Sequence, residues 1–216
     1  MNDQQGSVTT QTETIPLVKT YDGSGRNIIL AMTGTSGALY GLRMLRALLL
    51  NEFHVDLIMS DFAQYTLYKE CNIEIKPGSL NAIFPDVPAH KVSVSVHSNL
   101  DLKSIIFTND YVCSGMVISP CTMGVIAGIA NGSARNLIEK TADYAFSHNS
   151  PLIIVPRETP INKMHLENMT KIIDAGGMLV PAMPSFEYSP KSFDDLADYI
   201  AGKVMDLLCK NDKPLA

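Results

Sequence analysis

Several features that mark other classes of protein are absent from this sequence. The 216-residue chain has a formal net charge of −5 and no cluster of basic residues, which argues against nucleic acid as a partner. No apolar run is long enough to span a bilayer. The opening stretch MNDQQGSVTTQTETIPLVKT is polar and lacks the apolar core of a signal peptide. We therefore expect neither a membrane-spanning segment nor secretion.

Cysteine is also sparse. The cysteines Cys71, Cys113, Cys121 and Cys209 show no C-x-x-C spacing and no pairing with histidine of the kind found in metal sites. Because disulfides are rare in reducing compartments, we expect reduced thiols in a cytoplasmic protein, without a bound metal.

The composition favours a single folded domain. With 46% apolar residues, the chain is able to bury one substantial core. Residues 1–25 are predicted to form a disordered lead-in, residues 26–210 a single domain and residues 211–216 a tail. No internal repeat or low-complexity tract breaks this pattern.

The stretch from Asn27 to Leu50 is the most informative part of the chain. Its apolar run, Ile28 to Met32, is short and bounded, as in a buried parallel strand. The small residues Thr33 to Ala38 follow, and leucines then recur at helical spacing. Such a unit binds phosphate when the first free N–H groups of the helix point at an anion in the turn. An ordinary strand–turn–helix has the same pattern, and spacing alone does not separate the two interpretations.

The rest of the chain alternates between strand and helix patterns. We predict strands at 54–59, 91–96, 116–119, 152–155 and 178–180, and helices at 61–70, 136–146 and 162–175, with a final helix capped by Ser192. This order predicts an α/β protein with a Rossmann-like (flavodoxin-like) three-layer fold and a mainly parallel sheet. Ligands gather at the carboxyl ends of the strands in such folds. Since the first turn is neither G-x-G-x-x-G nor a Walker A loop, a dinucleotide or nucleoside triphosphate is not the first expectation.

Four stretches, taken together, point to one family. They are MTGTSGALYGLRML, the MVISPCTMG loop, NLIEKTADYAF with PLIIVPRETP and HLENM, and the closing PAMPSFEYSPKSFDDL. Over nearly all of Asn27 to Leu208 the chain resembles the UbiX-type flavin prenyltransferases. The resemblance implies a homododecamer that binds FMN between its subunits and uses no metal. It also implies transfer of a dimethylallyl group from dimethylallyl phosphate to N5 and C6 of reduced FMN, which makes prenylated FMN for a partner decarboxylase.

The resemblance further implies roles for individual residues. Ser36, Glu70 and Glu158 match the family's proton-handling groups around the flavin and the leaving phosphate. The positions that match its FMN contacts are Gly34, Thr35, Ser36, Ser60, Thr122, Met123, Gly124, Val125 and Arg157. A helix N-terminus and an arginine fork suit a phosphomonoester such as FMN. Taken singly, the two glutamates are more typical of a solvated helix end and of a salt bridge.

The sequence departs from the family where the resemblance places the prenyl-phosphate site. Ser147 stands where the family has a phosphate-binding lysine, and Glu187 where it has a tyrosine that holds the allylic phosphate. Lys140 and Lys203 replace arginines, which keeps the charge but loses the planar fork. The segment 107–110, FTND, replaces the family's A-S-G-S element. We therefore expect an intact flavin half of the site and an altered half for the second substrate.

Three functions stay open on this sequence. The first is a flavin prenyltransferase with an adapted phosphate pocket. The second is an FMN-binding paralogue that does not prenylate and acts on a different substrate, and the third is a non-catalytic flavin carrier. The retained Ser36, Glu70 and Glu158 argue against the carrier, which has no use for proton-handling groups. A flavin-dependent cysteine decarboxylase is disfavoured because no histidine stands where the motif of that relative has its base.

Overall fold

The computed structural model describes residues 21–76, 78–104, 106 and 111–210. Most of the predicted lead-in, the tail at 211–216 and the FTND segment at 107–110 lie outside the described residues. Tyr21, at the end of the predicted lead-in, is 4% exposed and belongs to the core. Its backbone N–H donates to the side chain of Asn51, and its hydroxyl donates to Asp206 Oδ1 over 2.9 Å. The folded part therefore includes residues that precede the first strand.

A six-stranded sheet forms the middle layer of the fold, in the order β3-β2-β1-β4-β5-β6. The strands are β1 (Asn27–Met32), β2 (His54–Met59), β3 (Val94–Ser98), β4 (Gly115–Cys121), β5 (Leu152–Pro156) and β6 (Met178–Leu179). Every neighbouring pair is parallel, so the predicted α/β fold with a parallel sheet is confirmed. The strand order reverses direction between β1 and β4, which is where doubly wound sheets bind their ligands.

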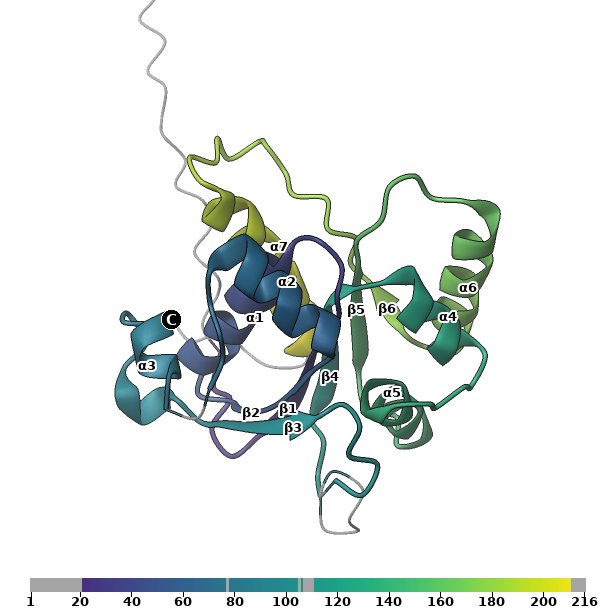
Figure 1. Cartoon of the computed structure of the whole chain (residues 1–216), viewed down its shortest axis with the longest axis horizontal. Coiled ribbons are helices and arrows are strands. Elements are labelled where there is room, and N and C mark those ends of the chain that lie inside the picture. Colours follow the sequence, from purple (N-terminus) through teal and green to yellow (C-terminus); the bar gives the residue numbers. More distant parts are fainter. Residues whose placement is uncertain (1–20, 77, 105, 107–110, 211–216) are drawn as a thin grey trace, which may run out of the picture.

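Helices cover both faces of this sheet, as Figure 1 shows. One face carries α1 (Ala38–Leu50), α2 (Asp61–Cys71), α3 (Leu80–Ile83), the short 3₁₀ helix Ala89–Lys91 and α7 (Phe193–Leu208). The other face carries α4 (Met123–Ala130), α5 (Leu137–Ser147) and α6 (Lys163–Asp174). The final helix begins as predicted, because Ser192 caps it in a capping box with Asp195. None of the described helices is both long and apolar enough to cross a membrane.

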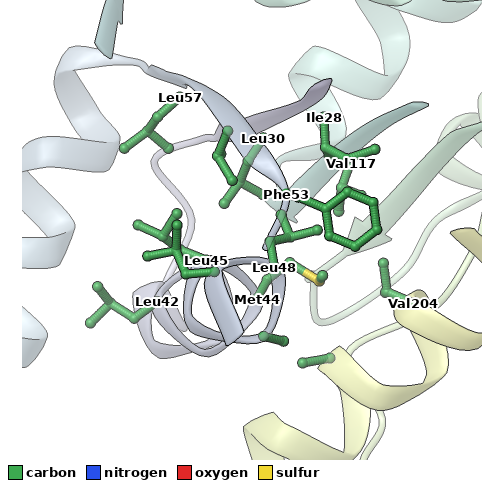
Figure 2. Packing of buried hydrophobic residues seen from close by; sticks show 14 of the residues in the cluster. Ile28, Leu30, Leu42, Met44, Leu45, Leu48, Phe53, Leu57, Val117 and Val204 are labelled. Carbon is green, nitrogen blue, oxygen red and sulfur yellow. The ribbon is translucent and has the colours of Figure 1, made fainter. Parts of the chain in front are cut away.

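The alternation of β1 divides the core between these two faces. Ile28 and Leu30 pack toward α1 and α7, whereas Ile29 and Ala31 pack toward the α4–α6 face. In Figure 2 the strand side chains meet Leu45 of α1, which is fully buried, and Val204 of α7. Burying one such leucine contributes about 1.5–3 kcal/mol, so this packing fixes α1 firmly on the sheet.

Two helices expose apolar side chains that their sequence pattern suggests are buried. On α2 the aromatic rings of Phe62 and Tyr65 are 75% and 59% exposed. On α6 the exposed fractions are 69% for Met164 and 54% for Leu166, and Ile172 is the buried position of that helix. The four cysteines, in contrast, are free thiols as predicted.

Candidate functional site

The turn between β1 and α1 is tied to the turn after β4. Thr33 Oγ1 donates to the carbonyl oxygen of Pro120 over 2.9 Å, and the backbone N–H of Thr122 donates to Thr33 Oγ1 over 2.8 Å. Gly37 precedes α1 with φ at 100°, a left-handed conformation that favours glycine. Gly34 is required for a different reason, because a Cβ there would lie 2.1 Å from Phe62 Cβ at the start of α2.

Three helices begin side by side at the carboxyl ends of β2, β1 and β4. Ser60 caps α2 by accepting from the N–H of Ala63 over 3.1 Å, and Thr122 caps α4 by accepting from Val125 over 3.3 Å. Both predicted flavin contacts therefore use their hydroxyl oxygen to fix a helix. Gly124, in the first turn of α4, borders open space, since an added Cβ would meet only Thr122 Oγ1 at 4.0 Å. Helix N-termini gathered in this way favour an anionic ligand.

The N-terminus of α1 already holds a carboxylate. Glu70, at the end of α2, accepts hydrogen bonds at Oε2 from the backbone N–H groups of Gly37 at 2.8 Å and Ala38 at 2.9 Å. Partial burial raises the pKa of Glu70, but the hydrogen bonds from Ser36, Ala38 and Gly37 and the charge of Arg157 outweigh it, and the pKa lies below its ordinary value. Glu70 is therefore ionised at neutral pH.

Arg157 follows β5 and faces the same place. Its backbone N–H donates to the carbonyl of Cys121 over 3.2 Å, and its own carbonyl accepts from Thr35 Oγ1 over 3.0 Å. No described residue forms a hydrogen bond or ion pair with the guanidinium group, so this cation is available to a ligand. Its position is set by the backbone, which leaves the side-chain fork free.

Two cavities meet at Arg157 and Tyr40, which line both. The larger has a volume of about 870 Å³ and is bounded by α1, the end of α2, the α3 region and the start of α7. Ser36 and Glu70 line it. The smaller has a volume of about 250 Å³, and Met123 and Glu158 are among its lining residues. The predicted catalytic residues thus lie on both sides of Arg157.

Glu158 is placed differently from Glu70. Its side chain is exposed, and Oε1 accepts from the N–H of Thr159 over 2.9 Å. Arg157 forms an ion pair with neither Glu158 nor Glu167, and Glu167 instead pairs with Lys163. Among the described residues, no group of three or more histidine, cysteine, aspartate or glutamate side chains is arranged to hold a metal ion.

The four altered positions do not come together within one subunit. On α5, Lys140 Nζ donates to the carbonyl of Leu102 over 3.3 Å, and Ser147 Oγ donates to the carbonyl of Asp143 over 2.9 Å. Lys203 lies on α7, across the sheet, with Nζ 5.3 Å from the centre of the Tyr199 ring. The remaining position, Glu187, is exposed. None of the four lines either cavity at Arg157.

Two features were missed from the sequence. Tyr40 has the spacing of an ordinary apolar position of α1, yet it forms the shared wall of both cavities, and burial raises its pKa against the opposing charge of Arg157. Asp56 is buried in β2, where it accepts from Tyr111 at 2.6 Å and contacts His97 Nε2 at 2.7 Å. The sequence signal that could have identified this buried polar cluster is an aspartate within an otherwise apolar strand.

Comparisons with known proteins identify the family of this chain. A family model described as Flavoprotein matches residues 17–205. A flavin prenyltransferase UbiX from Methanothermobacter thermautotrophicus is 40% identical over 182 residues, which cover 84% of this chain and 89% of that protein. Another, from Alkalihalophilus pseudofirmus, is 36% identical over 83% of this chain and 89% of its own. The chain belongs to the flavoprotein family and, within it, to the UbiX flavin prenyltransferases.

Solved structures give the same result. A crystal structure of AnUbiX in complex with FMN and dimethylallyl pyrophosphate has a TM-score of 0.76 and 32% identity, covering 85% of this chain and 92% of that one. A dodecameric FMN-dependent UbiX-like decarboxylase from Escherichia coli O157:H7 has a TM-score of 0.73 and 31% identity, covering 84% and 93%. The fold and the family are therefore both those that the sequence motifs predicted.

Proposed function

We propose that this protein binds reduced FMN and transfers a dimethylallyl group to it from dimethylallyl phosphate, making prenylated FMN for a partner decarboxylase. The observation that carries the proposal is the unpaired guanidinium of Arg157, which lies between two cavities with the ionised Glu70 nearby. An unpaired cation suits a phosphate, and a carboxylate suits a proton leaving the flavin ring. The relatives named as flavin prenyltransferases support the same activity.

The flavin half of the site is proposed to follow the carboxyl ends of β1, β2 and β4. Gly34, Thr35, Ser36 and Ser60 would hold the flavin from one side, and the segment 122–125 with Arg157 from the other. The open space at Gly124, which a Cβ there would narrow, and the helix N-termini at the carboxyl ends of these strands fit an anionic, planar ligand. AnUbiX, whose structure contains FMN, supports this cofactor.

The proposed reaction requires only charge stabilisation and proton transfer from the residues of the protein. The bonds that form join the allyl group to N5 and C6 of the flavin, and the carbon–oxygen bond to phosphate breaks with both electrons leaving on phosphate. N5 and C6 each lose a proton. One of these is balanced by the proton added to the allyl double bond, and the other is taken up by the released phosphate. Arg157 would stabilise the charge that grows on the phosphate, and Glu70 would accept the proton from C6. We assign Ser36 and Glu158 to the remaining proton transfers.

The altered positions require an assembly to contribute. Because Lys140 and Ser147 lie on the face of the sheet opposite Lys203, one subunit does not offer them as a single phosphate pocket. We propose a homododecamer in the cytoplasm, in which these positions and Glu187 approach the site of a neighbouring subunit. The dodecameric relative from Escherichia coli and the exposed apolar side chains on α2 and α6 support this arrangement.

The flavin that copurifies with the protein tests the proposal. We expect extraction and mass spectrometry to identify FMN or prenylated FMN, bound in amounts close to one per subunit. The paralogue and the carrier would both retain unmodified FMN alone, even when the donor is supplied with reduced FMN. A protein that remains colourless and gains no thermal stability with excess FMN would overturn the flavin site itself.

A further inference from the structure

The larger cavity continues well beyond the residues assigned to the transfer. It starts at Ser36 and Gly37 and follows α1 as far as Arg46. Gly37 and Arg46 are nine residues apart on one helix, which spans roughly 13 Å at 1.5 Å per residue. A volume of about 870 Å³ lies in the upper part of the range of small-molecule sites. A five-carbon allyl group would fill only the part nearest to Arg157.

The two ends of the cavity differ in charge. At the near end no described residue forms a hydrogen bond or ion pair with the guanidinium of Arg157, whereas the ionised Glu70 is occupied by hydrogen bonds from Ser36, Gly37 and Ala38. At the far end both arginines are neutralised. Arg43 Nε donates to Asp198 over 2.6 Å, and Arg46 Nε donates to Asp86 over 2.8 Å. An anionic group of a ligand therefore finds an unpaired cation at the near end. At the far end the arginines are already paired with aspartates, so a charged group of a ligand gains nothing there.

Apolar side chains line the space between these ends. Leu39 and Leu42 of α1 face it from one side, Ile83 and Phe84 from the α3 region, and Leu196 from α7. Phe193, at the start of α7, is 81% exposed and lies at the margin of the same cavity. A surface of this kind gains free energy when it is covered by hydrocarbon. The cavity thus suits a ligand with one anionic head and an elongated apolar body.

We infer that the larger cavity binds the hydrocarbon tail of an allylic phosphate longer than dimethylallyl, of the ten-carbon geranyl class. This inference rests on the proposed function, because it places the donor's phosphate at Arg157. Each isoprene unit adds roughly 5 Å of extended chain, from carbon–carbon bonds of about 1.5 Å. Two units match the length of the cavity, and three exceed it. The bonds made and broken are unchanged, because the added carbons lie beyond the two that become attached to the flavin.

Binding is measured without turnover by using the protein loaded with oxidised FMN, to which no transfer occurs. Titration calorimetry with geranyl monophosphate and dimethylallyl monophosphate gives the two affinities. We expect geranyl monophosphate to bind at least about tenfold more tightly, because its second isoprene unit covers apolar surface. Equal affinities, weaker binding of the geranyl compound or no binding of either would overturn the inference. Because no transfer to oxidised FMN occurs, this experiment tests only donor binding. The proposed transfer reaction is tested separately, in an assay with reduced FMN.

A variant that narrows the cavity locates the tail. Leu196→Trp places a large ring over the apolar part of the cavity, and we expect the affinity ratio of the two phosphates to fall to about one. Leu100→Trp is the matched control, since Leu100 is 77% exposed and lies outside both cavities at Arg157. It should leave the ratio as in the unaltered protein. If the ratio of the two affinities is unchanged in Leu196→Trp, the hydrocarbon tail binds elsewhere.

Discussion

Glu70 and Gly37 are joined by a hydrogen bond of 2.8 Å, in which the carboxylate accepts from the first free N–H group at the start of α1. The bond connects residues 33 positions apart and closes α2 over the β1–α1 turn. It also places a permanent negative charge where the helix dipole favours one. The anion predicted at this helix end is therefore supplied by the chain itself, next to the space where the phosphate of a ligand would meet Arg157.

Glu70→Gln tests the proposed base. The amide retains an oxygen that accepts from Gly37 and Ala38, so the fold and FMN affinity should be kept. We expect kcat for prenyl transfer to fall by about 10²- to 10⁴-fold, because glutamine does not accept a proton. Glu74→Gln is the matched control, since Glu74 pairs with Lys76 on the surface and should be replaceable without effect. An unchanged kcat in Glu70→Gln would remove Glu70 from the mechanism.

The pH dependence follows from the same residue. Because the pKa of Glu70 is lowered from 4.5, its carboxylate is the form present throughout the neutral range. Activity that needs this carboxylate should be constant above pH 4.5 and should fall only as the pH drops through the lowered pKa. The contribution of Glu70 to stability has the same sign, present above that range and lost below it. A rate that depends on a group with pKa raised into the neutral range would contradict this assignment.

Arg157→Gln tests the anion site. One charge-assisted hydrogen bond that contributes about 1.5–3 kcal/mol would be lost, so we expect FMN or donor affinity to fall by about 10- to 100-fold. Fluorescence titration with FMN and calorimetry with dimethylallyl monophosphate would show which ligand is affected. Arg26→Gln is the control, because Arg26 precedes the amino end of β1, whereas Arg157 follows the carboxyl end of β5, and the guanidinium of Arg26 lies over the ring of Phe53. Equal affinities in Arg157→Gln and the unaltered protein would exclude this role.

Local pattern was enough to predict the sheet and most helices, because apolar runs such as that of β1 are short and clearly bounded. Burial was harder to predict. Phe62 and Met164 have the spacing of core residues, but periodicity does not distinguish a core from a surface that another subunit covers. The contact of Glu70 with Gly37 and the role of Tyr40 depend on how α2 and β5 approach α1. Such tertiary contacts have no local signal, and only the family resemblance pointed to Glu70 and Arg157.

The exposed apolar side chains of α6 predict an assembly. Light scattering at micromolar concentration should give a homo-oligomer, and the proposed stoichiometry is twelve subunits. Met164→Glu should shift it to smaller species, because the methionine is 69% exposed in the single subunit and a buried charge opposes association. Lys163→Gln changes the net charge by the same amount on the same helix and should leave the assembly intact, since it removes a charge and does not place one on the apolar surface. A monomer in the unaltered protein would contradict the proposal.

The altered positions predict a gain of function. Ser147→Lys with Glu187→Tyr restores a cation and removes an anion at the positions that the family uses for the allylic phosphate. We expect kcat/KM for dimethylallyl phosphate to rise at least tenfold, because pre-placed donors stabilise the charge that develops on the leaving phosphate. Each single variant should give a smaller increase. If the double variant is no faster than the unaltered protein, these positions do not contact the donor.

The most direct measurement is the flavin product itself. The unaltered protein, incubated without oxygen with reduced FMN and dimethylallyl phosphate, is quenched at intervals and the flavin is analysed by mass spectrometry. We expect a flavin heavier than FMN by one dimethylallyl group in place of hydrogen, formed with phosphate in equal amount and abolished by Glu70→Gln. FMN that binds tightly but keeps its mass over many hours, with no phosphate released, would contradict the assignment of this protein as a flavin prenyltransferase.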